Sequence, residues 1–179
     1  MRLFEKKLSE NRIYDGRIIR LHVDDVLLEN GNTSKREVIE HPGGVSVAVL
    51  TESDEILFVR QFRYPYGKAV LELPAGKLEP GEDPFEAVKR EQKEETGTTG
   101  TDYVYLGDIY PSPGYTSEII RLWLCRLGST GSSSPDDDEF LEIEKIEIGE
   151  ALKMVMSGKI KDAKTQIGIL KTAAFLNRL

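Results

Sequence analysis

Apolar positions along the chain form short runs, several of them alternating with polar positions. These runs predict β-strands, with one helical segment between them and two more at the end. Asn30-Gly31 is a strong signal for a hairpin turn after the first strand. The order of elements indicates an α/β sandwich that follows a β-rich N-terminal region. The predicted strands are residues 17–28, 33–40, 45–50, 56–61, 69–73, 103–109, 118–127 and 141–148, and the predicted helices are 84–96, 150–157 and 162–177.

The central helix carries its own boundary signals and a dense group of charges. Asp83 is a good N-cap, and Gly97 suits a left-handed stop. At 3.6 residues per turn, Glu91, Glu94 and Glu95 share one face of the helix. Like charges at this spacing repel, whereas a hard divalent cation such as Mg²⁺ would make the arrangement favourable. The alternative interpretation is an exposed, solvated acidic helix whose carboxylates pair with neighbouring lysines and arginines.

The stretch around this helix resembles the Nudix box, G-x5-E-x7-R-E-U-x-E-E-x-G-U, in which U is a bulky aliphatic residue. Its glycine and charged positions are all present at their spacing: Gly76, Glu82, Arg90, Glu91, Glu94, Glu95 and Gly97. Gln92 and Thr98 depart from the pattern because they stand where the family usually has aliphatic residues. Gln92 follows Val88 by one turn on the core-facing stripe. Its amide must therefore find hydrogen-bond partners or cost on the order of 1–3 kcal/mol.

Composition narrows the class of protein. The chain has 179 residues, a length typical of one domain, and its net charge of −7 argues against nucleic acid as a main partner. Its single cysteine, Cys125, lies in an apolar run and is interpreted as a buried structural thiol. The chain has no apolar N-terminal region and no run near 20 apolar residues. We therefore expect a soluble, cytoplasmic protein with no membrane partner.

Segments outside the box narrow the resemblance to the ADP-ribose pyrophosphatase branch of the family. Pro113 follows Gly97 by sixteen residues, within the run Y-P-S-P-G-Y-T-S-E at 110–118. An ordinary turn is the alternative for that run. Arg36-Glu37-Val38, Gln61-Phe62-Arg63 and D-A-K-T at 162–165 are also similar to the branch. The resemblance covers most of the chain and implies a Nudix α/β/α sandwich with a mixed β-sheet, at residues 43–179. Residues 1–42 would form an N-terminal antiparallel β-hairpin region for dimerisation and substrate contacts.

The resemblance also assigns roles to individual residues. It implies Mg²⁺, with Mn²⁺ as a substitute, held by the carboxylates of Glu91, Glu94 and Glu95 and by the backbone carbonyl of Ala75. An ion pair between Arg90 and Glu82 would support this face as a scaffold. For Arg36 and Arg63, two of the substrate-binding candidates, the alternative interpretation is a surface salt bridge. The supporting residues are Gly76, Glu82 and Arg90, and the substrate-binding candidates are Arg36, Arg63, Pro113, Gly114 and Glu118.

The general base is expected outside the box. In the branch it comes from a mobile acidic loop between the last two strands, which corresponds here to residues 136–139. Asp137 or Glu139 falls at the relevant position, with a slight preference for Glu139, and Glu94 is the candidate within the box. A solvated acidic tip is the alternative interpretation of this loop.

These assignments predict a Mg²⁺-dependent ADP-sugar pyrophosphatase that converts ADP-ribose to AMP and ribose 5-phosphate. The family implies a homodimer with exchanged N-terminal strands. Two alternatives stay open: a Nudix hydrolase for another nucleoside diphosphate compound, and a catalytically silent domain that binds ADP-ribose as a sensor. The intact carboxylates of Glu91, Glu94 and Glu95 weigh against the sensor.

Overall fold

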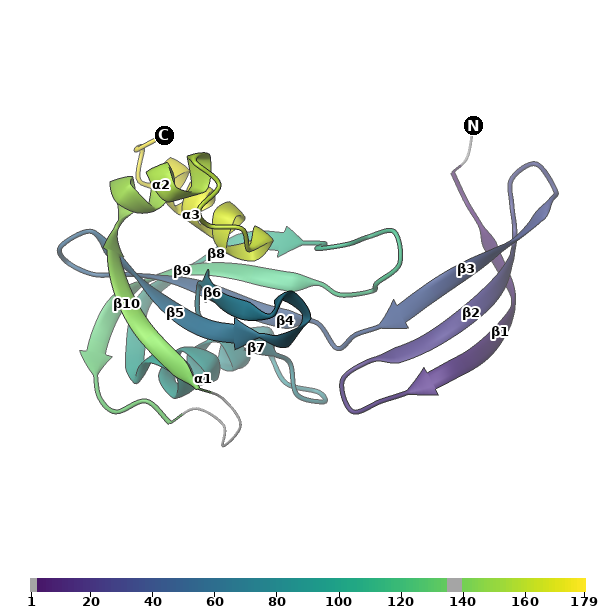
Figure 1. The fold of residues 1–179 in the computed structure, drawn as a ribbon, viewed down its shortest axis with the longest axis horizontal. Helices are drawn as coiled ribbons and strands as arrows, with labels where there is room; N and C mark the ends of the chain where they lie inside the picture. The colour runs from purple at the N-terminus through teal and green to yellow at the C-terminus, as the bar shows by residue number, and fades with distance from the viewer. Residues whose placement is uncertain (1–2, 135–139) are drawn as a thin grey trace. The chain divides into compact units, whose positions relative to one another are not determined.

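The computed structural model describes residues 3–134 and 140–179, and the chain separates into two compact units (Figure 1). One unit combines Met1–Gly43 with Tyr110–Ile119, and the other combines Gly44–Ile109 with Ile120–Leu179. Each unit contains its own β-sheet. The loop 110–119 is therefore grouped with the N-terminal residues, although it follows the central helix in sequence.

The N-terminal unit is a three-stranded antiparallel sheet rather than a hairpin alone. Strands β1 (Lys6–Asp15), β2 (Arg20–Leu27) and β3 (Thr33–Glu40) lie in the order β1-β2-β3. Gly31 supports the turn before β3 with a φ of 83°, as its position in the predicted hairpin requires. Strand β1 was not predicted as a separate element because every one of its residues is exposed. Such a strand has no buried face to leave an apolar alternation in the sequence.

The loop that belongs to this unit adds hydrogen bonds at the end of β3. The N–H of Ile39 donates to the carbonyl of Tyr115 at 2.7 Å, and the N–H of Ser117 donates to the carbonyl of Ile39 at 2.9 Å. The N–H of His41 donates to Ser117 Oγ at 3.0 Å. Several predicted substrate-binding residues lie on this loop, so β3 determines part of their backbone conformation.

The second unit is built on a seven-stranded mixed sheet. Its longest path runs β10-β5-β4-β9-β8, with β6 paired to β5 and β7 paired to β4. The pairing of β4 with β9 is parallel and the others are antiparallel. The strands are β4 (Gly44–Leu50), β5 (Glu55–Arg63), β6 (Lys68–Glu72), β7 (Ala75–Lys77), β8 (Thr98–Ile109), β9 (Ile120–Thr130) and β10 (Leu141–Glu147).

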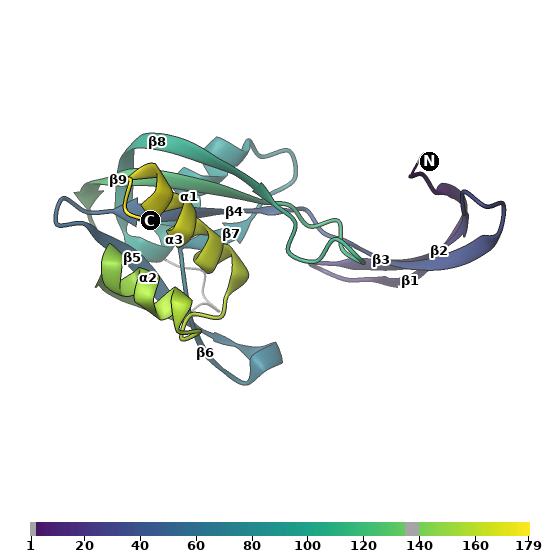
Figure 2. The same ribbon diagram turned by 90° about the horizontal axis from the view of Figure 1, so that it is seen from above.

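The described residues of this unit also form three α-helices, α1 (Pro84–Thr96), α2 (Ile148–Met156) and α3 (Ala163–Phe175), and a short 3-10 helix, η1 (Tyr64–Tyr66). Helix α1 lies on one face of the sheet, and α2 and α3 lie on the other, as both views show (Figures 1 and 2). Two separate buried clusters match this arrangement, one containing Ala87 and Val88 of α1 and the other containing residues of α2 and α3. The predicted α/β sandwich with a mixed sheet is confirmed. Among the described residues, no helix is long and apolar enough to cross a membrane.

Candidate active site

Local sequence signals fix where α1 begins and ends, and so which face its carboxylates occupy. Asp83 accepts hydrogen bonds from the N–H groups of Phe85 and Glu86 at 2.9 and 3.2 Å, which satisfies two of the unpaired donors at the start of the helix. Gly97 ends the helix with a φ of 66°. Both predicted boundaries are confirmed. Val88 is completely buried against the sheet. Glu95 follows it by seven residues and so lies on the same side of the helix, whereas Glu94 lies toward solvent.

The three predicted metal ligands on α1 differ in exposure. Glu94 is the most accessible, with 39% of its side chain exposed, and Glu91 retains 13%. Glu95 is buried at 3% exposure, and its Oε2 accepts a hydrogen bond from the N–H of Ala75 at 2.9 Å. Carboxylates are costly to bury unless they are paired or coordinate a metal. Glu95 and the neighbouring Glu91 and Glu94 offer the carboxylate oxygens that a hard divalent cation prefers.

Arg90 joins this face to the loop that precedes the helix. Its Nη1 donates to Glu91 Oε1 and Glu94 Oε2, each at 2.8 Å. Its Nε and Nη2 donate to the two oxygens of Glu82 at 2.8 and 3.0 Å, and this two-pronged contact lowers the pKa of Glu82 and raises that of Arg90. Nη2 also reaches the carbonyl of Lys77 at 3.3 Å. The pair expected between Arg90 and Glu82 is present, and its role as support for a metal site stays a prediction.

Gly76 allows strand β7 to approach α1 closely. A Cβ added at Gly76 would lie 1.9 Å from Glu91 Cδ and 2.0 Å from its Oε1. Pairing with β4 fixes this strand, since Val45 stands opposite Gly76 and Ser46 opposite Ala75. Only glycine fits beside the Glu91 carboxylate in this arrangement. The strand thus brings the Ala75 backbone, a predicted ligand, to the carboxylates of α1.

A buried carboxylate that sequence reasoning missed lies just before this strand. Glu72 is 2% exposed and accepts hydrogen bonds from Arg63 Nε and Nη2 at 2.6 and 2.8 Å and from Lys164 Nζ. Burial alone would raise the pKa of Glu72, but the two cations outweigh it and the pKa is lowered. Arg63, predicted to contact substrate, is thus one partner of an ion pair, with 40% of its side chain exposed. The signal available in the sequence was a charged residue inside the apolar run Leu71-Glu72-Leu73.

The other predicted substrate-binding residues belong to the N-terminal unit. Arg36 lies on β3, where its Nε donates to Glu5 Oε2 at 2.9 Å and its Nη2 to Glu5 Oε1 at 2.5 Å. Glu118 Oε1 lies 3.7 Å from Nδ1 of His41. Pro113 and Gly114 are exposed in the loop 110–119. Arg36 and Glu118 thus each already contact an ionisable side chain, Glu5 and His41 respectively.

The predicted general bases Asp137 and Glu139 lie outside the described residues. Of the three catalytic candidates, the structure therefore places only Glu94. Its position at the exposed edge of the acidic face leaves it accessible to solvent and to a bound molecule.

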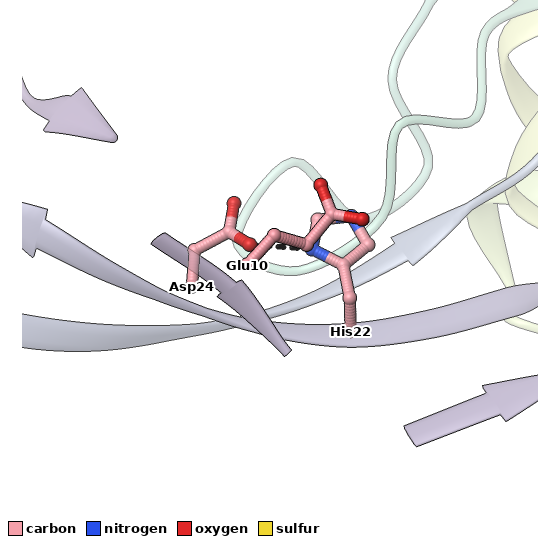
Figure 3. Close-up of side chains that lie close together, drawn as sticks. All are labelled: Glu10, His22 and Asp24. Atoms are coloured by element: carbon pink, nitrogen blue, oxygen red, sulfur yellow. Dashed lines mark hydrogen bonds and ion pairs between the residues drawn. The ribbon is translucent and has the colours of Figure 1, made fainter. Parts of the chain in front are cut away.

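A second group of metal-type ligands occurs in the three-stranded sheet: Glu10, His22 and Asp24 offer one ligand atom each within 4.8 Å of one another (Figure 3). His22 Nδ1 lies 2.7 Å from Asp24 Oδ1. Lys7 contacts both carboxylates, with Nζ 2.7 Å from Glu10 and 3.6 Å from Asp24. Its hydrogen bond, together with that of Arg12, lowers the pKa of Glu10 to about 2. Because lysine and arginine already neutralise these carboxylates, this group is better described as an ion-pair network than as a cation site.

Comparisons with known proteins agree with this geometry. Residues 40–165 match the NUDIX domain, and residues 5–39 match the nucleoside diphosphate sugar hydrolase N-terminal domain. The mixed sheet, with the capped acidic helix α1 on one face, and the match to the NUDIX domain together define a Nudix-type hydrolase domain. The chain belongs to the Nudix hydrolase family, as its box predicts.

Individual relatives cover most of the chain. It is 41% identical over 169 residues to an ADP-ribose pyrophosphatase of Bacillus subtilis (strain 168), which spans 93% of this chain and 91% of that protein. It is also 41% identical over 171 residues to a methanol dehydrogenase activator of Bacillus methanolicus, with 94% and 92% covered. An ADP-ribose pyrophosphatase of Mycobacterium tuberculosis is 31% identical over 170 residues, with 93% and 82% covered. The predicted family and enzyme class are confirmed.

Proposed function

We propose that this protein hydrolyses the pyrophosphate bond of ADP-ribose, and of related ADP-sugars, to AMP and the sugar phosphate. The observation that carries the proposal is the acidic face of α1. Glu91 and Glu94 bond to Arg90 there, and Glu95 bonds to the Ala75 backbone. Glu82, in the loop before the helix, binds the same arginine. The match of residues 5–39 to a nucleoside diphosphate sugar hydrolase domain supports the substrate class. The ADP-ribose pyrophosphatases among the relatives support the choice of ADP-ribose.

The donor set of this face fits a divalent metal, which Nudix hydrolases generally use. Mg²⁺ prefers carboxylate and carbonyl oxygens, which these side chains and the Ala75 backbone can supply. Glu91, Glu94, Glu95 and the carbonyl of Ala75 would hold it, with Mn²⁺ as a substitute. When bound, the metal would neutralise phosphate charge and lower the pKa of a water molecule. Because Gly76 has no Cβ, β7 lies close enough to Glu91 for its backbone to share the site.

The chain's own side chains supply binding and proton transfer in this proposal. One water oxygen forms a bond to a phosphorus atom, the bond from that phosphorus to the bridging oxygen breaks, and a carboxylate takes the proton. Glu139 or Asp137 is proposed as that carboxylate, with Glu94 as the candidate on α1. Arg90 Nη1 bonds to both Glu91 and Glu94, and its positive charge offsets the repulsion between their carboxylates.

Two arginines are proposed as substrate contacts. Arg36 and Arg63 suit phosphate contacts because a guanidinium binds oxyanions through two parallel hydrogen bonds. Each already binds a glutamate in this way, Glu5 or Glu72, so substrate phosphate would compete for donors that are already oriented. Glu118 would accept from a ribose hydroxyl, beside Pro113 and Gly114.

Residues 1–42 are proposed as a dimerisation region ahead of a hydrolase domain at 43–179, in a cytoplasmic homodimer. Exposed apolar side chains on β1, including Leu8, Ile13 and Tyr14, support an interface there. A second copy of the chain could also pair with the backbone N–H and C=O groups along the outer edge of β1.

A second candidate activity is hydrolysis of GDP-mannose. A GDP-mannose pyrophosphatase of Yersinia enterocolitica is 30% identical over 153 aligned positions, which cover 79% of this chain. GDP-mannose is the second candidate substrate because this relative is less identical to the chain than the two ADP-ribose pyrophosphatases are. Product analysis separates the two substrates directly.

The experiment incubates purified protein with Mg²⁺ and either ADP-ribose or GDP-mannose, and resolves the nucleotides by chromatography. Glu95→Gln removes one charge from the acidic face, and Glu86→Gln removes one from the same helix at an exposed site paired with Lys89. We expect AMP from ADP-ribose with the wild type and with Glu86→Gln, and on the order of 100-fold less with Glu95→Gln. Saturable ADP-ribose binding without AMP would overturn hydrolysis in favour of a sensor.

A further inference from the structure

The two residues that depart from the Nudix box contact each other. Gln92 on α1 and Thr98 at the start of β8 are both buried, at 0% and 4% exposure. Gln92 Nε2 donates to Thr98 Oγ1 at 3.0 Å. Each replaces an aliphatic side chain of the usual pattern, and each supplies the polar partner that the other needs. The departures are therefore one feature rather than two.

Thr96 closes this contact into a ring. Its Oγ1 donates to the main-chain carbonyl of Gln92 at 2.5 Å and lies 2.7 Å from Thr98 Oγ1. A hydroxyl has one proton to donate. Thr96 uses its proton on Gln92, so Thr98 must donate to Thr96 while accepting from the Gln92 amide. The hydrogen bonds run from the Gln92 side chain through Thr98 and Thr96 back to the Gln92 backbone.

The other end of the Gln92 amide is tied to the sheet. Its Oε1 accepts from the hydroxyl of Tyr103 on β8 at 2.7 Å and from Cys125 Sγ on β9 at 3.4 Å. Burial raises the pKa of Cys125 to about 12, so the thiol keeps the proton that it donates. One side chain on α1 is thus bonded to two strands, β8 and β9.

We propose that Gln92 is a positioning residue that fixes the rotation of α1 about its axis, and thereby sets the Glu91 and Glu95 carboxylates for metal binding. The inference rests on the proposed function, because it assigns the metal to those carboxylates. Apolar side chains tolerate small rotations of a helix, whereas directed hydrogen bonds weaken steeply when their angles change. Gln92 immediately follows Glu91 and precedes Glu95 by three residues, so all three side chains turn together.

A small rotation of α1 is enough to misplace its carboxylates for metal binding. With side chains, a helix has a radius of about 5–6 Å, so a rotation of about 10° moves a surface carboxylate by about 1 Å. A displacement of that size is significant beside a Mg²⁺–oxygen bond of about 2.0–2.1 Å. Loss of a group that orients a metal ligand commonly weakens metal binding by about 10–100-fold. The same loss in a merely structural contact would lower stability without changing the affinity of the folded protein.

The test measures Mn²⁺ binding to the full chain by electron paramagnetic resonance of the free ion, without substrate, alongside thermal unfolding. The variants are Gln92→Leu, the nearly isosteric Thr98→Val, and the pair together. Val155→Ala serves as the control, because Val155 is a buried residue of α2 in the core on the opposite face of the sheet. It lowers stability through a cavity and contacts none of the ring.

We expect each single variant to bind Mn²⁺ at least about tenfold more weakly than the wild type, and Val155→Ala to bind it with unchanged affinity. The double variant should lose less affinity than the two single losses added together. Thr98→Val keeps the proposal testable if Gln92→Leu does not fold. Wild-type affinity in the folded single variants, or equal weakening by Val155→Ala, would overturn the positioning role. A wild type that binds no Mn²⁺ would overturn the proposed metal face as well, which distinguishes the two failures.

Discussion

Replacing Gly76 with alanine should abolish most activity while leaving the fold largely intact. The added Cβ would lie 1.9 Å from Glu91 Cδ, whereas non-bonded carbon atoms rest about 3.5–4.0 Å apart. The carboxylate must therefore move by at least about 1.5 Å. Gly76 itself needs no special backbone conformation, since it is not among the glycines with positive φ. The substitution thus isolates the steric effect on Glu91.

The expected size of the effect follows from that displacement. A reacting or ligating group misplaced by about 1 Å can cost about 100-fold in rate, which corresponds to about 2.7 kcal/mol of transition-state stabilisation. The clashing atoms are the end of a flexible side chain, so the free energy of unfolding should fall by only about 1 kcal/mol. We expect kcat/KM for ADP-ribose to drop at least about 100-fold while Tm changes by a few degrees.

Two controls make this prediction refutable. Gly67→Ala introduces strain at a φ of 61° with no atom near the new Cβ, so it should lower stability by about 1 kcal/mol and preserve kcat/KM. In a Glu91→Ala background the clash partner is gone, so adding Gly76→Ala should leave Tm unchanged. An undiminished kcat/KM in Gly76→Ala, or the same fall in Tm with and without the Glu91 side chain, would refute the reasoning.

Two further predictions concern the ion pairs behind this face. Arg90→Lys keeps the charge but cannot bind both Glu82 oxygens in parallel, so kcat/KM should fall about 10–100-fold, and a wild-type rate would show that charge alone suffices. Glu72→Gln should cost about 3 kcal/mol at pH 7, because Arg63 loses its carboxylate partner and Lys164 keeps only its ion pair with Asp162. Because the folded pKa of Glu72 is lowered, its contribution is present above the unfolded value of about 4.3 and is lost as pH falls through the folded value. Urea unfolding should therefore show the two proteins converging at acidic pH, and a gap independent of pH would contradict this.

The parts of the structure that could be predicted from the sequence are those with local causes. Helix α1 needs only the Asp83 cap, the Gly97 stop and the stripe that contains Val88, all within one segment. The shared face of its carboxylates follows from helical geometry alone. Strand β3 was bounded correctly for the same reason, since the turn at Asn30-Gly31 precedes it directly.

Elements without a local signature could not be predicted in this way. Strand β1 is exposed along its whole length, so burial leaves no period in its sequence. Glu72 shows the same limit for a site residue, because its partner Lys164 lies 92 positions away. A charge inside an apolar run indicates that a partner must exist, but only the fold can say which one. The ion pair of Arg63 with Glu72 is likewise not encoded by any spacing in the sequence.

Gln92 and Thr98 show how tertiary contacts can reverse the meaning of a sequence pattern. Taken singly, each is a polar residue at an aliphatic position and predicts a loss of helix packing. Six residues separate them in sequence, and the left-handed turn at Gly97 folds one back onto the other. The polar atoms are then satisfied within the core, so the expected cost of 1–3 kcal/mol for an unpaired amide does not arise. Directed bonds replace non-directional packing at the one helix whose rotation matters for the acidic face.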